Sequence, residues 1–553
     1  MSDPSVELTL QQLEVYNCVR DSYSTACGMG CLLYCITPTQ IKMAIEGLKL
    51  GTAPGCDGVL GEHLRYGLCT ELLDHLSNAL TVICKFNIVP HNFTTGILIP
   101  ILKKTTLNPT LPENYRPLTL STTFSKLFET ISAVTFTPAD TQFGFVEGRG
   151  CEQVAMFIND LCSLSVYSND SLFITSLDAA KCFDCVWHAG LFFKLLPIMP
   201  IVLWRFYYQW YLNLVTIVRV NDVYGSPFKV TRGIRQGSKV SPLFFNVFIN
   251  ELLSELQSCN AGIRTANNTF NHVAYADDLT LFSSTAIGMQ CLINMCEEYA
   301  KLWRFQYNPQ KTQAAIVSKN GRSPFVVNPT LLMYQSPIKY CNDINVLGCT
   351  FGTDGSCTLN AENRLTKFSH AFHAMSHKGL TSPYLTCTTK SYLFKTGCQS
   401  VLMYALGALH FPDKIIKMMD KAQGRTVKQM FRFPLRCHNS SLLRALGING
   451  VKQQIGKRTA SLVSNVFKCS FNPCQLLYVH LLKQYYQGIM IPGTSVHRLL
   501  QYGFNPTTSM LRCAPVTDVA PMDGVADSLK FLMFLDPFLN VNHDVIFNFI
   551  RCF

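Results

Sequence analysis

Two adjacent carboxylates, Asp277 and Asp278, are the clearest candidates for chemistry in this 553-residue chain. They interrupt the apolar stretch His272-Val-Ala-Tyr-Ala-Asp-Asp-Leu-Thr-Leu-Phe282, a pattern that predicts two strands joined by a tight turn. Two carboxylates about 4 Å apart repel each other by roughly 4 kcal/mol at an effective dielectric constant near 20. A rigid hairpin that presents such a pair is suited to a divalent cation, whereas the alternative is a solvated turn.

A third carboxylate follows a second apolar strand. Ser171-Leu-Phe-Ile-Thr-Ser-Leu-Asp178 predicts a buried strand with Asp178 at its carboxyl end. Together with the hairpin, it would complete the carboxylate set of a two-metal phosphoryl-transfer site. Phe183 lies five residues later and is suited either to packing beneath a sugar or to filling the core.

Three cations stand at the ends of two predicted strands. Gly96-Ile-Leu-Ile-Pro-Ile-Leu-Lys-Lys104 ends in Lys103 and Lys104, and the strand Asn114–Ser121 carries Arg116. If these strand ends are neighbours, the three side chains form a clamp for phosphate, since Arg binds it bidentately and Lys as a point charge. The alternative is that they are ordinary surface cations.

A glycine-containing loop separates the carboxylates along the chain. In Arg232-Gly-Ile-Arg-Gln-Gly-Ser-Lys239, Gly237 has no side chain, so a base or sugar could approach the backbone beside Gln236. Ser241 and Pro242 then predict the start of a helix over about 241–257. The alternative is a capped helix after a basic loop.

A basic stripe lies further along the chain, at steps of three and four residues that fit one face of a helix. Its members are Lys414, Lys417, Lys421, Arg425, Lys428, Arg432 and Arg436. Only one acidic residue, Asp420, interrupts it, so the stripe favours a phosphate backbone over a merely solvated face.

Composition limits the classes of protein to consider. A chain of this length suggests two to four domains, and 48% hydrophobic with 15% charged residues excludes general disorder. The net charge of +12 favours a polyanionic partner. We expect an intracellular protein, nuclear or cytoplasmic, because no secretory signal and no membrane span are visible. The 24 cysteines are then expected to be mostly reduced thiols.

The order of these motifs, from about Gly51 to about Arg458, resembles the reverse transcriptase of non-LTR (LINE-type) retrotransposons. The matching motifs are Asn114-Tyr-Arg-Pro-Leu, Gln142-Phe-Gly-Phe, Leu177-Asp178 with Phe183-Asp184, Arg235-Gln-Gly, Ser241-Pro-Leu-Phe-Phe-Asn, Ala274-Tyr-Ala-Asp-Asp278, Lys311-Thr and Val346-Leu-Gly348.

The resemblance implies an α+β fold, a right-hand polymerase with fingers, a ferredoxin-like palm and a helical thumb, plus helical extensions. We expect five regions along the chain. They are a helical N-terminal extension at 1–50, fingers at 51–170 with the palm beginning near their end, the palm at 171–350, the thumb at 351–465 and a C-terminal helical region of unknown role at 466–553.

The resemblance also implies a role for each candidate residue. Asp178 and Asp277 match the metal-binding aspartates, and Asp278 matches the third acidic position. Lys311 matches a lysine that acts as general acid for departing pyrophosphate. Phe183 matches the gate that excludes a ribose 2′-hydroxyl. The residues that would hold template and nucleotide are Gln236, Gly237, Lys103, Lys104 and Arg116.

These roles imply an RNA-directed DNA polymerase that uses two magnesium ions, with manganese as an alternative. Its partners would be an RNA template, a DNA primer and deoxynucleoside triphosphates, with no membrane. No endonuclease or ribonuclease H segment is recognisable, so we expect a separate endonuclease to nick the target DNA. The span 129–142 is about ten residues shorter than usual, which leaves a competing hypothesis: a retroelement-derived nucleic-acid-binding protein without polymerase activity. A template-independent nucleotidyl transferase would need neither the clamp nor the stripe.

Overall fold

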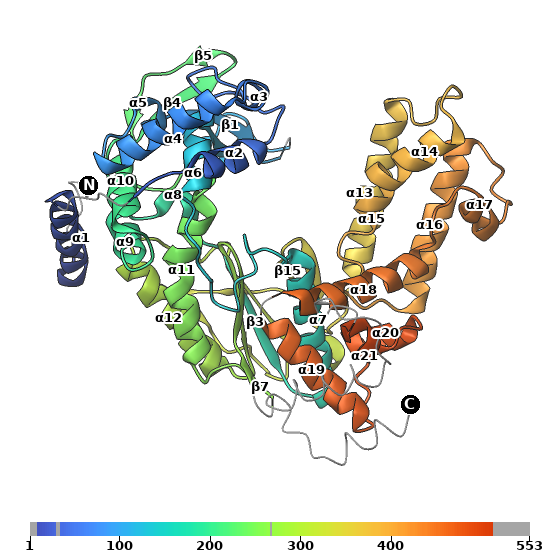
Figure 1. The fold of residues 1–553 in the computed structure, drawn as a ribbon. Helices are drawn as coiled ribbons and strands as arrows, with labels where there is room; N and C mark the ends of the chain where they lie inside the picture. Colours follow the sequence, from blue (N-terminus) through green and yellow to red (C-terminus); the bar gives the residue numbers. More distant parts are fainter. Residues whose placement is uncertain (1–7, 29–33, 105, 266–267, 470, 512–553) are drawn as a thin grey trace, which may run out of the picture.

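Two lobes rise from a common base and face each other in the computed structural model of this chain (Figure 1). The structure describes residues 8–28, 34–104, 106–265, 268–469 and 471–511. The first lobe is built mostly from the N-terminal part of the chain, the base from a central sheet, and the second lobe from helices that follow this sheet.

The first lobe is a mixed sheet covered by helices. Its strands run in the order β2-β1-β4-β5, with β6 also pairing with β4. Its elements are α1 (Leu10–Gly28), α2 (Pro38–Glu46), α3 (Gly61–Tyr66), α4 (Thr70–Lys85), α5 (His91–Thr94), β1 (Thr95–Leu102), η1 (Pro112–Asn114), β2 (Tyr115–Leu120), α6 (Thr123–Ile131), α8 (Cys182–Cys185), α9 (His188–Leu195), α10 (Ile201–Leu212), β4 (Val215–Val220), β5 (Val223–Tyr224) and β6 (Phe228–Lys229).

The base holds the principal sheet, whose strand order is β14-β11-β3-β10-β9. Its elements are α7 (Cys151–Ser168), β3 (Leu172–Leu177), α11 (Ser241–Ser258), β7 (Ile263–Arg264), β8 (Thr269–Phe270), β9 (His272–Tyr275), β10 (Asp278–Ser283), α12 (Ala286–Leu302), β11 (Gln313–Val317), η2 (Lys319–Gly321), β12 (Leu332–Met333), β13 (Ser336–Pro337), β14 (Lys339–Tyr340), β15 (Asp343–Val346) and β16 (Cys349–Gly352).

The central four strands confirm the predicted ferredoxin-like palm. In chain order the elements are β3, α11, β9, β10, α12 and β11, and β3 pairs antiparallel with both β10 and β11. This is the split β-α-β-β-α-β motif. Side chains alternate along β3, so Phe173 and Leu177 join the core with α11, while Leu172 and Ile174 join the core with α7. Burial on both faces explains why β3 is continuously apolar.

The second lobe is helical, and three further helices pack below it. The lobe comprises α13 (Thr358–His377), α14 (Cys387–Leu393), η3 (Phe394–Gln399), α15 (Ser400–Leu402), α16 (Asp413–Phe431), α17 (Asn439–Ala445) and α18 (Val451–Lys468). The helices below are α19 (Pro473–Tyr486), α20 (Ser495–Gln501) and α21 (Pro506–Leu511). Helical structure is therefore confirmed up to Leu511, and the rest of the predicted C-terminal region lies outside the described residues.

The strand pairing differs from the predicted division of the chain in one respect. We predicted that 171–350 forms the palm as one block, yet β4 pairs parallel with β1 and thus belongs to the first lobe. A division into continuous segments misses this arrangement, because the chain leaves the base after β3, contributes β4 to the first lobe and returns to the base at α11.

Two other expectations concern cysteines and membranes. Every cysteine in the described part of the chain is a free thiol. Within the same ranges no helix is both long enough and apolar enough to span a bilayer.

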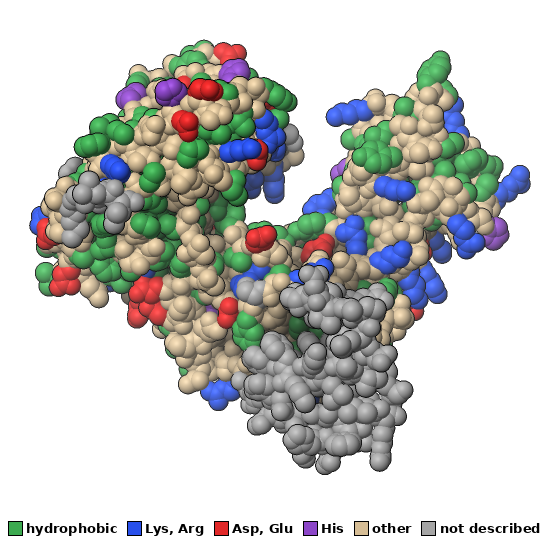
Figure 2. Space-filling model, in the orientation of Figure 1, with side chains coloured by type: hydrophobic (Ala, Val, Ile, Leu, Met, Phe, Trp, Pro, Cys, Tyr) green, Lys and Arg blue, Asp and Glu red, His purple; other side chains and the backbone are tan. Residues whose placement is uncertain are grey.

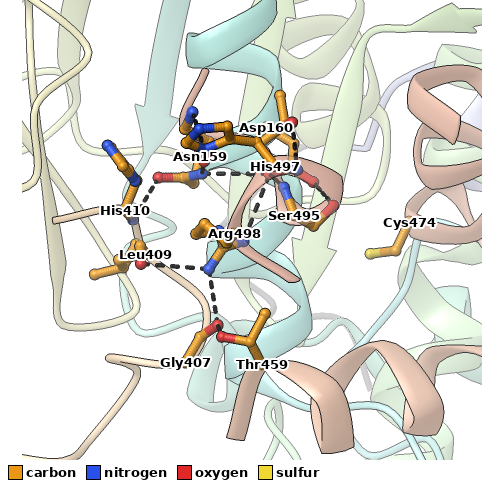
Figure 3. A network of polar contacts seen from close by, with 12 residues as sticks. Asn159, Asp160, Gly407, Leu409, His410, Thr459, Cys474, Ser495, His497 and Arg498 are labelled. Carbon is orange, nitrogen blue, oxygen red and sulfur yellow. Dashed lines mark hydrogen bonds and ion pairs between the residues drawn. The ribbon is translucent and has the colours of Figure 1, made fainter. Parts of the chain in front are cut away.

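A buried ion pair ties α20 to α7 (Figure 3). Arg498 is fully buried, and its Nη2 lies 3.6 Å from Oδ1 of Asp160, which also accepts the backbone N–H of Ser495 at 2.9 Å. Arg498 Nη1 donates to the carbonyl of Gly407 at 2.7 Å. The neighbouring Asn159 donates to the carbonyl of Gly493 at 3.0 Å. The C-terminal helices are thus fixed to the base through a buried polar network.

We expect Asp160→Asn to lower the free energy of unfolding by about 3–5 kcal/mol, because it leaves the Arg498 guanidinium buried without a countercharge. Chemical denaturation measures this change. Asp170→Asn is the matched control, since Asp170 is exposed just beyond the same helix. Equal midpoints for the two variants would contradict a role for the ion pair in stability.

Candidate active site

The hairpin β9–β10 carries two of the three predicted carboxylates at its tip. Tyr275 pairs with Asp278, so Ala276 and Asp277 form a two-residue turn. Ala276 has a φ angle of 57°, a left-handed conformation that costs a residue with a β-carbon about 1–3 kcal/mol. The surrounding structure must therefore hold this turn in place.

The third carboxylate lies beside the hairpin. Asp178 directly follows β3, and the antiparallel register pairs Leu177 with Leu279. Extending this register by one residue sets Asp178 opposite Asp278, and opposite residues in an antiparallel pair share a face of the sheet. The structure thus brings Asp178 together with Asp277 and Asp278, although Asp178 stands 99 residues before Asp277 in the chain.

Burial and mutual repulsion raise the pKa values of the two carboxylates in the hairpin. Burial raises the pKa of Asp277, and the charge of Asp178 raises it further, while Arg116 opposes the shift. Burial and the charges of Asp277 and Asp178 raise the pKa of Asp278 to about 6. The fold therefore holds carboxylates at a cost that a bound cation would relieve.

Cations surround the carboxylates from two sides. Lys311 Nζ lies 3.8 Å from Asp178 Oδ2, and both side chains are open to solvent. Arg116 comes from β2 of the first lobe and acts on the charge of Asp277. Both predicted cations thus lie at the carboxylate site.

Lys103 and Lys104 follow β1, next to the strand that carries Arg116. The pairing of Ile101 with Arg116 continues to Lys103, whose N–H donates to the carbonyl of Asn114 at 2.8 Å. The ammonium of Lys103 donates to the carbonyl of Glu113 at 2.8 Å and helps to lower the pKa of Asp184, which burial raises. Lys104 is exposed. The register places all three cations near the same end of the β1–β2 pair, and their role as a phosphate clamp stays a prediction.

The loop with Gln236 and Gly237 connects β6 of the first lobe to α11 of the base. Gln236 Nε2 donates to Asp184 Oδ1 at 3.0 Å, and the carbonyl of Gln236 accepts the N–H of Thr119 in β2. Gly237 has a φ angle of 116°, and a β-carbon there would lie 2.8 Å from the carbonyl oxygen of Thr119. The glycine is therefore required for packing against β2, a reason that the sequence did not indicate.

The sequence suggested that the basic residues of this loop could bind a ligand, but Arg235 is already engaged by the protein. Arg235 is buried, and its guanidinium donates to the carbonyls of Phe93 and Thr94. Buried Glu129 accepts from Ser238 Oγ at 2.8 Å and from the N–H of Lys239 at 2.7 Å. Arg235 and Glu129 hold the loop, a role that the sequence pattern did not reveal.

Phe183 stands in a short aromatic stack. Its ring is stacked on Phe245 at 4.5 Å between centroids and meets the edge of Phe145 at 6.1 Å. Phe183 is half-buried, so part of its side chain is exposed. The ring packs against other aromatic residues, and its contact with a sugar stays a prediction.

Gln142 is a residue whose function the sequence did not predict. Its fully buried Oε1 accepts the N–H groups of Gly144 and Ala276, both at 2.8 Å. The segment around it pairs with β9, and Phe143 N–H donates to the carbonyl of Ala274 at 2.8 Å. Arg149 supports this segment through the carbonyl of Gln142. Gln142 thus clamps the strained turn that presents Asp277.

Gly144 makes the same clamp possible by its lack of a side chain. A β-carbon at Gly144 would lie 2.1 Å from the backbone nitrogen of Ala276. The Gln-Phe-Gly-Phe motif was visible in the sequence, but nothing in its spacing pointed to the hairpin 130 residues away.

Residues 101–351 match the reverse transcriptase (RNA-dependent DNA polymerase) family. Over 474 residues, the chain is 25% identical to the probable RNA-directed DNA polymerase from transposon BS of Drosophila melanogaster, covering 81% of this chain and 50% of that protein. It is 24% identical over 335 residues to the RNA-directed DNA polymerase from mobile element jockey of the same species, covering 56% of this chain and 35% of that protein.

A third relative is the Pol polyprotein from the type-2 retrotransposable element R2DM of Drosophila melanogaster. It is 25% identical over 280 residues, covering 49% of this chain and 26% of that protein. The chain therefore spans half or less of the length of these three relatives.

The fold and the site define a right-hand polymerase domain, with two lobes above a ferredoxin-like sheet that carries the carboxylates. More narrowly, residues 101–351 are a reverse transcriptase domain, and the chain is related to the polymerases of non-LTR retrotransposons.

Proposed function

We propose that this chain is an RNA-directed DNA polymerase that extends a DNA primer on an RNA template. One observation carries the proposal: three carboxylates from β3 and from the β9–β10 hairpin lie within electrostatic reach of each other, with Arg116 and Lys311 beside them. Phosphoryl transfer needs little more than positioned charges around the reacting phosphate.

The metal chemistry of the site fits two divalent cations, for which we propose magnesium, with manganese as a substitute. Carboxylate oxygens are the hard ligands that these ions prefer, and their mutual repulsion favours a bound cation. Among the described residues no three such side chains already converge as a finished cage, so the ions and substrate would complete the geometry. We propose that Asp178 and Asp277 bind directly and that Asp278 supports them.

When bound, two such ions supply Lewis-acid stabilisation to the attacking and leaving oxygens. The protein would provide the rest. Lys103, Lys104 and Arg116 would hold the triphosphate, and Gln236 with Gly237 would position template and nucleotide. Lys311 Nζ would donate a proton to the departing pyrophosphate. Its position 3.8 Å from Asp178 Oδ2 supports this assignment.

Primer extension tests the proposal directly. Purified chain is mixed with a DNA primer on an RNA template, the four deoxynucleoside triphosphates and either Mg²⁺ or Mn²⁺. We expect template-dependent products with both metals and none in chelator. Protein that binds primer–template but adds no nucleotide with either metal would contradict the proposal and support the nucleic-acid-binding alternative.

The architecture suggests how substrates are held. We propose that the first lobe corresponds to the fingers, the base to the palm and 351–465 to the thumb, with primer and template in the cleft between lobes. We also propose that an endonuclease is among its partners and nicks the target DNA.

We predict that Phe183→Val relaxes discrimination against ribonucleotides, because the smaller side chain leaves space for a 2′-hydroxyl. The expected change is about 10- to 100-fold in the ratio of kcat/KM for dCTP over CTP, the range typical of a reshaped apolar pocket. Phe157→Val is the control, since Phe157 is buried in the core on the far face of the sheet. An unchanged ratio for Phe183→Val would remove this residue from sugar selection.

A further inference from the structure

A pocket of about 890 Å³ opens between α16, α17 and the start of α18. In Figure 1, α16 and α17 form the side of the helical lobe away from the first lobe, whereas α13 lies on the side that faces it. The pocket therefore lies away from the side of the helical lobe that faces the first lobe.

Positive charge dominates this pocket. Four exposed cations from three chain segments line it, namely Lys417, Lys421, Arg436 and Arg444. None of the four forms an ion pair with any residue in the described ranges. On the face drawn in Figure 2, Lys and Arg are scattered over the helical lobe and acidic side chains are few.

The other charged side chains at the pocket are already engaged by the protein. Asp420 accepts the N–H of Val451 at 2.7 Å and so caps α18. Lys428 is buried and donates to the carbonyl of Leu435 at 2.6 Å, which corrects its predicted place on the basic stripe. The four exposed cations thus remain available for an external anion.

Hydrogen bonds and close packing hold the floor of the pocket. Buried Gln399 and Gln423 both donate to the carbonyl of Asn449, at 3.2 Å and 3.0 Å. Gly424 packs so closely on Asn439 that a β-carbon there would lie 2.4 Å from the amide. A preformed site of this kind binds its ligand with little loss of conformational entropy.

Two features favour single-stranded nucleic acid over a simple anion. The volume lies within the range of about 300–1,000 Å³ typical of ligand pockets, so it suits an unpaired nucleotide with its phosphates rather than a duplex. The segment that carries Arg436 also exposes Phe433, which offers a ring for base stacking. Amides of Asn439, Asn449 and Gln453 line the wall and could pair with base edges.

We propose that this outer basic pocket, defined by Lys417, Lys421, Arg436 and Arg444, binds a single-stranded segment of nucleic acid outside the polymerase cleft. The strand's phosphates pair with the four cations while one or two of its bases enter the pocket. A polymerase with such a site would hold a flanking part of its RNA or a displaced DNA strand while the cleft holds the primer end.

Crosslinking and binding on the full chain test the proposal. The cleft is first saturated with an unlabelled blunt primer–template duplex, and a fluorescent 12-nucleotide RNA containing 4-thiouridine is then added. A DNA oligonucleotide with 4-thiothymidine forms the second arm, which distinguishes the two sources of the strand. We expect crosslinks on residues 433–453 with at least one of the two.

The variant K417E/K421E should weaken this binding about tenfold or more at 0.1 M salt. It should also reduce the slope of log Kd against log salt by about 1.4, which corresponds to two phosphate contacts on a single strand. K301E/K319E is the charge-matched control, since both lysines are exposed on the base. Primer extension on a template without flanking sequence is measured alongside, and K301E/K319E should leave it unchanged.

Equal affinities and slopes for K417E/K421E and its control would overturn the proposal, as would crosslinks confined to the cleft. With the cleft already saturated, tighter binding of a labelled duplex than of either labelled single strand would overturn it as well. Because the readout is binding, a chain that fails to extend primers would refute the proposed polymerase activity without deciding this question.

Discussion

Asp277→Asn is expected to reduce primer extension by about three orders of magnitude or more while the protein stays folded. The carboxylate lies at the tip of the β9–β10 turn and would bind the ions that stabilise the transferring phosphate, a contribution of several kcal/mol. Single-turnover extension on an RNA template, with Mg²⁺ varied up to tens of times the wild-type requirement, measures the loss.

The same variant has a second expected effect that separates metal binding from folding. Burial and neighbouring charge raise the pKa values of Asp277 and Asp278, so the ionised pair opposes folding above those pKa values. Without metal, Asp277→Asn should therefore melt at the same temperature as wild type or higher. Added Mg²⁺ should raise the melting temperature of wild type much more than that of the variant.

Asp74→Asn is the control, because Asp74 is exposed on α4, far from the carboxylates. It should behave as wild type in both measurements. Full activity of Asp277→Asn, or equal stabilisation of both proteins by Mg²⁺, would rule out Asp277 as a metal ligand.

Gly144→Ala is the second change with a large expected effect, although Gly144 carries no functional group. Its new β-carbon would overlap the backbone nitrogen of Ala276, so the hairpin tip must move. A displacement of about 1 Å in a reacting group can reduce the rate about 100-fold. Overpacking at this site should also lower the free energy of unfolding by about 1–3 kcal/mol.

Gly150→Ala tests whether the effect is specific to the contact between Gly144 and the hairpin turn. A β-carbon at Gly150 meets nothing within 4 Å, so both rate and stability should change little. Gln142→Leu complements the pair, since it keeps the size of the side chain but removes the oxygen that accepts the Ala276 N–H. A Gly144→Ala protein with wild-type activity would show that the hairpin needs no support from this segment.

The sequence was enough to predict which carboxylates lie together. Asp178, Asp277 and Asp278 each stand at the end of an apolar strand, where the alternation of side chains and the turn between strands leave few other arrangements. The same local rules predicted α11 and the apolar strand β3 almost to the residue. Local pattern determines these elements because their buried faces must be apolar.

Other features depend on pairings between distant segments, which local pattern cannot encode. Arg235 and Lys428 read as basic surface residues, yet both are buried and donate to backbone carbonyls. Close packing against the Thr119 carbonyl also requires glycine at position 237.

The chain's own residues thus determined which groups could react: three carboxylates with cations nearby. Only the tertiary structure decided how they are presented, because the strained turn at Ala276 is stabilised by Gln142 and Gly144, from a segment 130 residues earlier. The outer basic pocket also exists only in three dimensions, since its cations come from α16, α17 and the loop between them. In both cases the physical reason is the same: contacts between remote segments set the position of side chains whose type the sequence already specified.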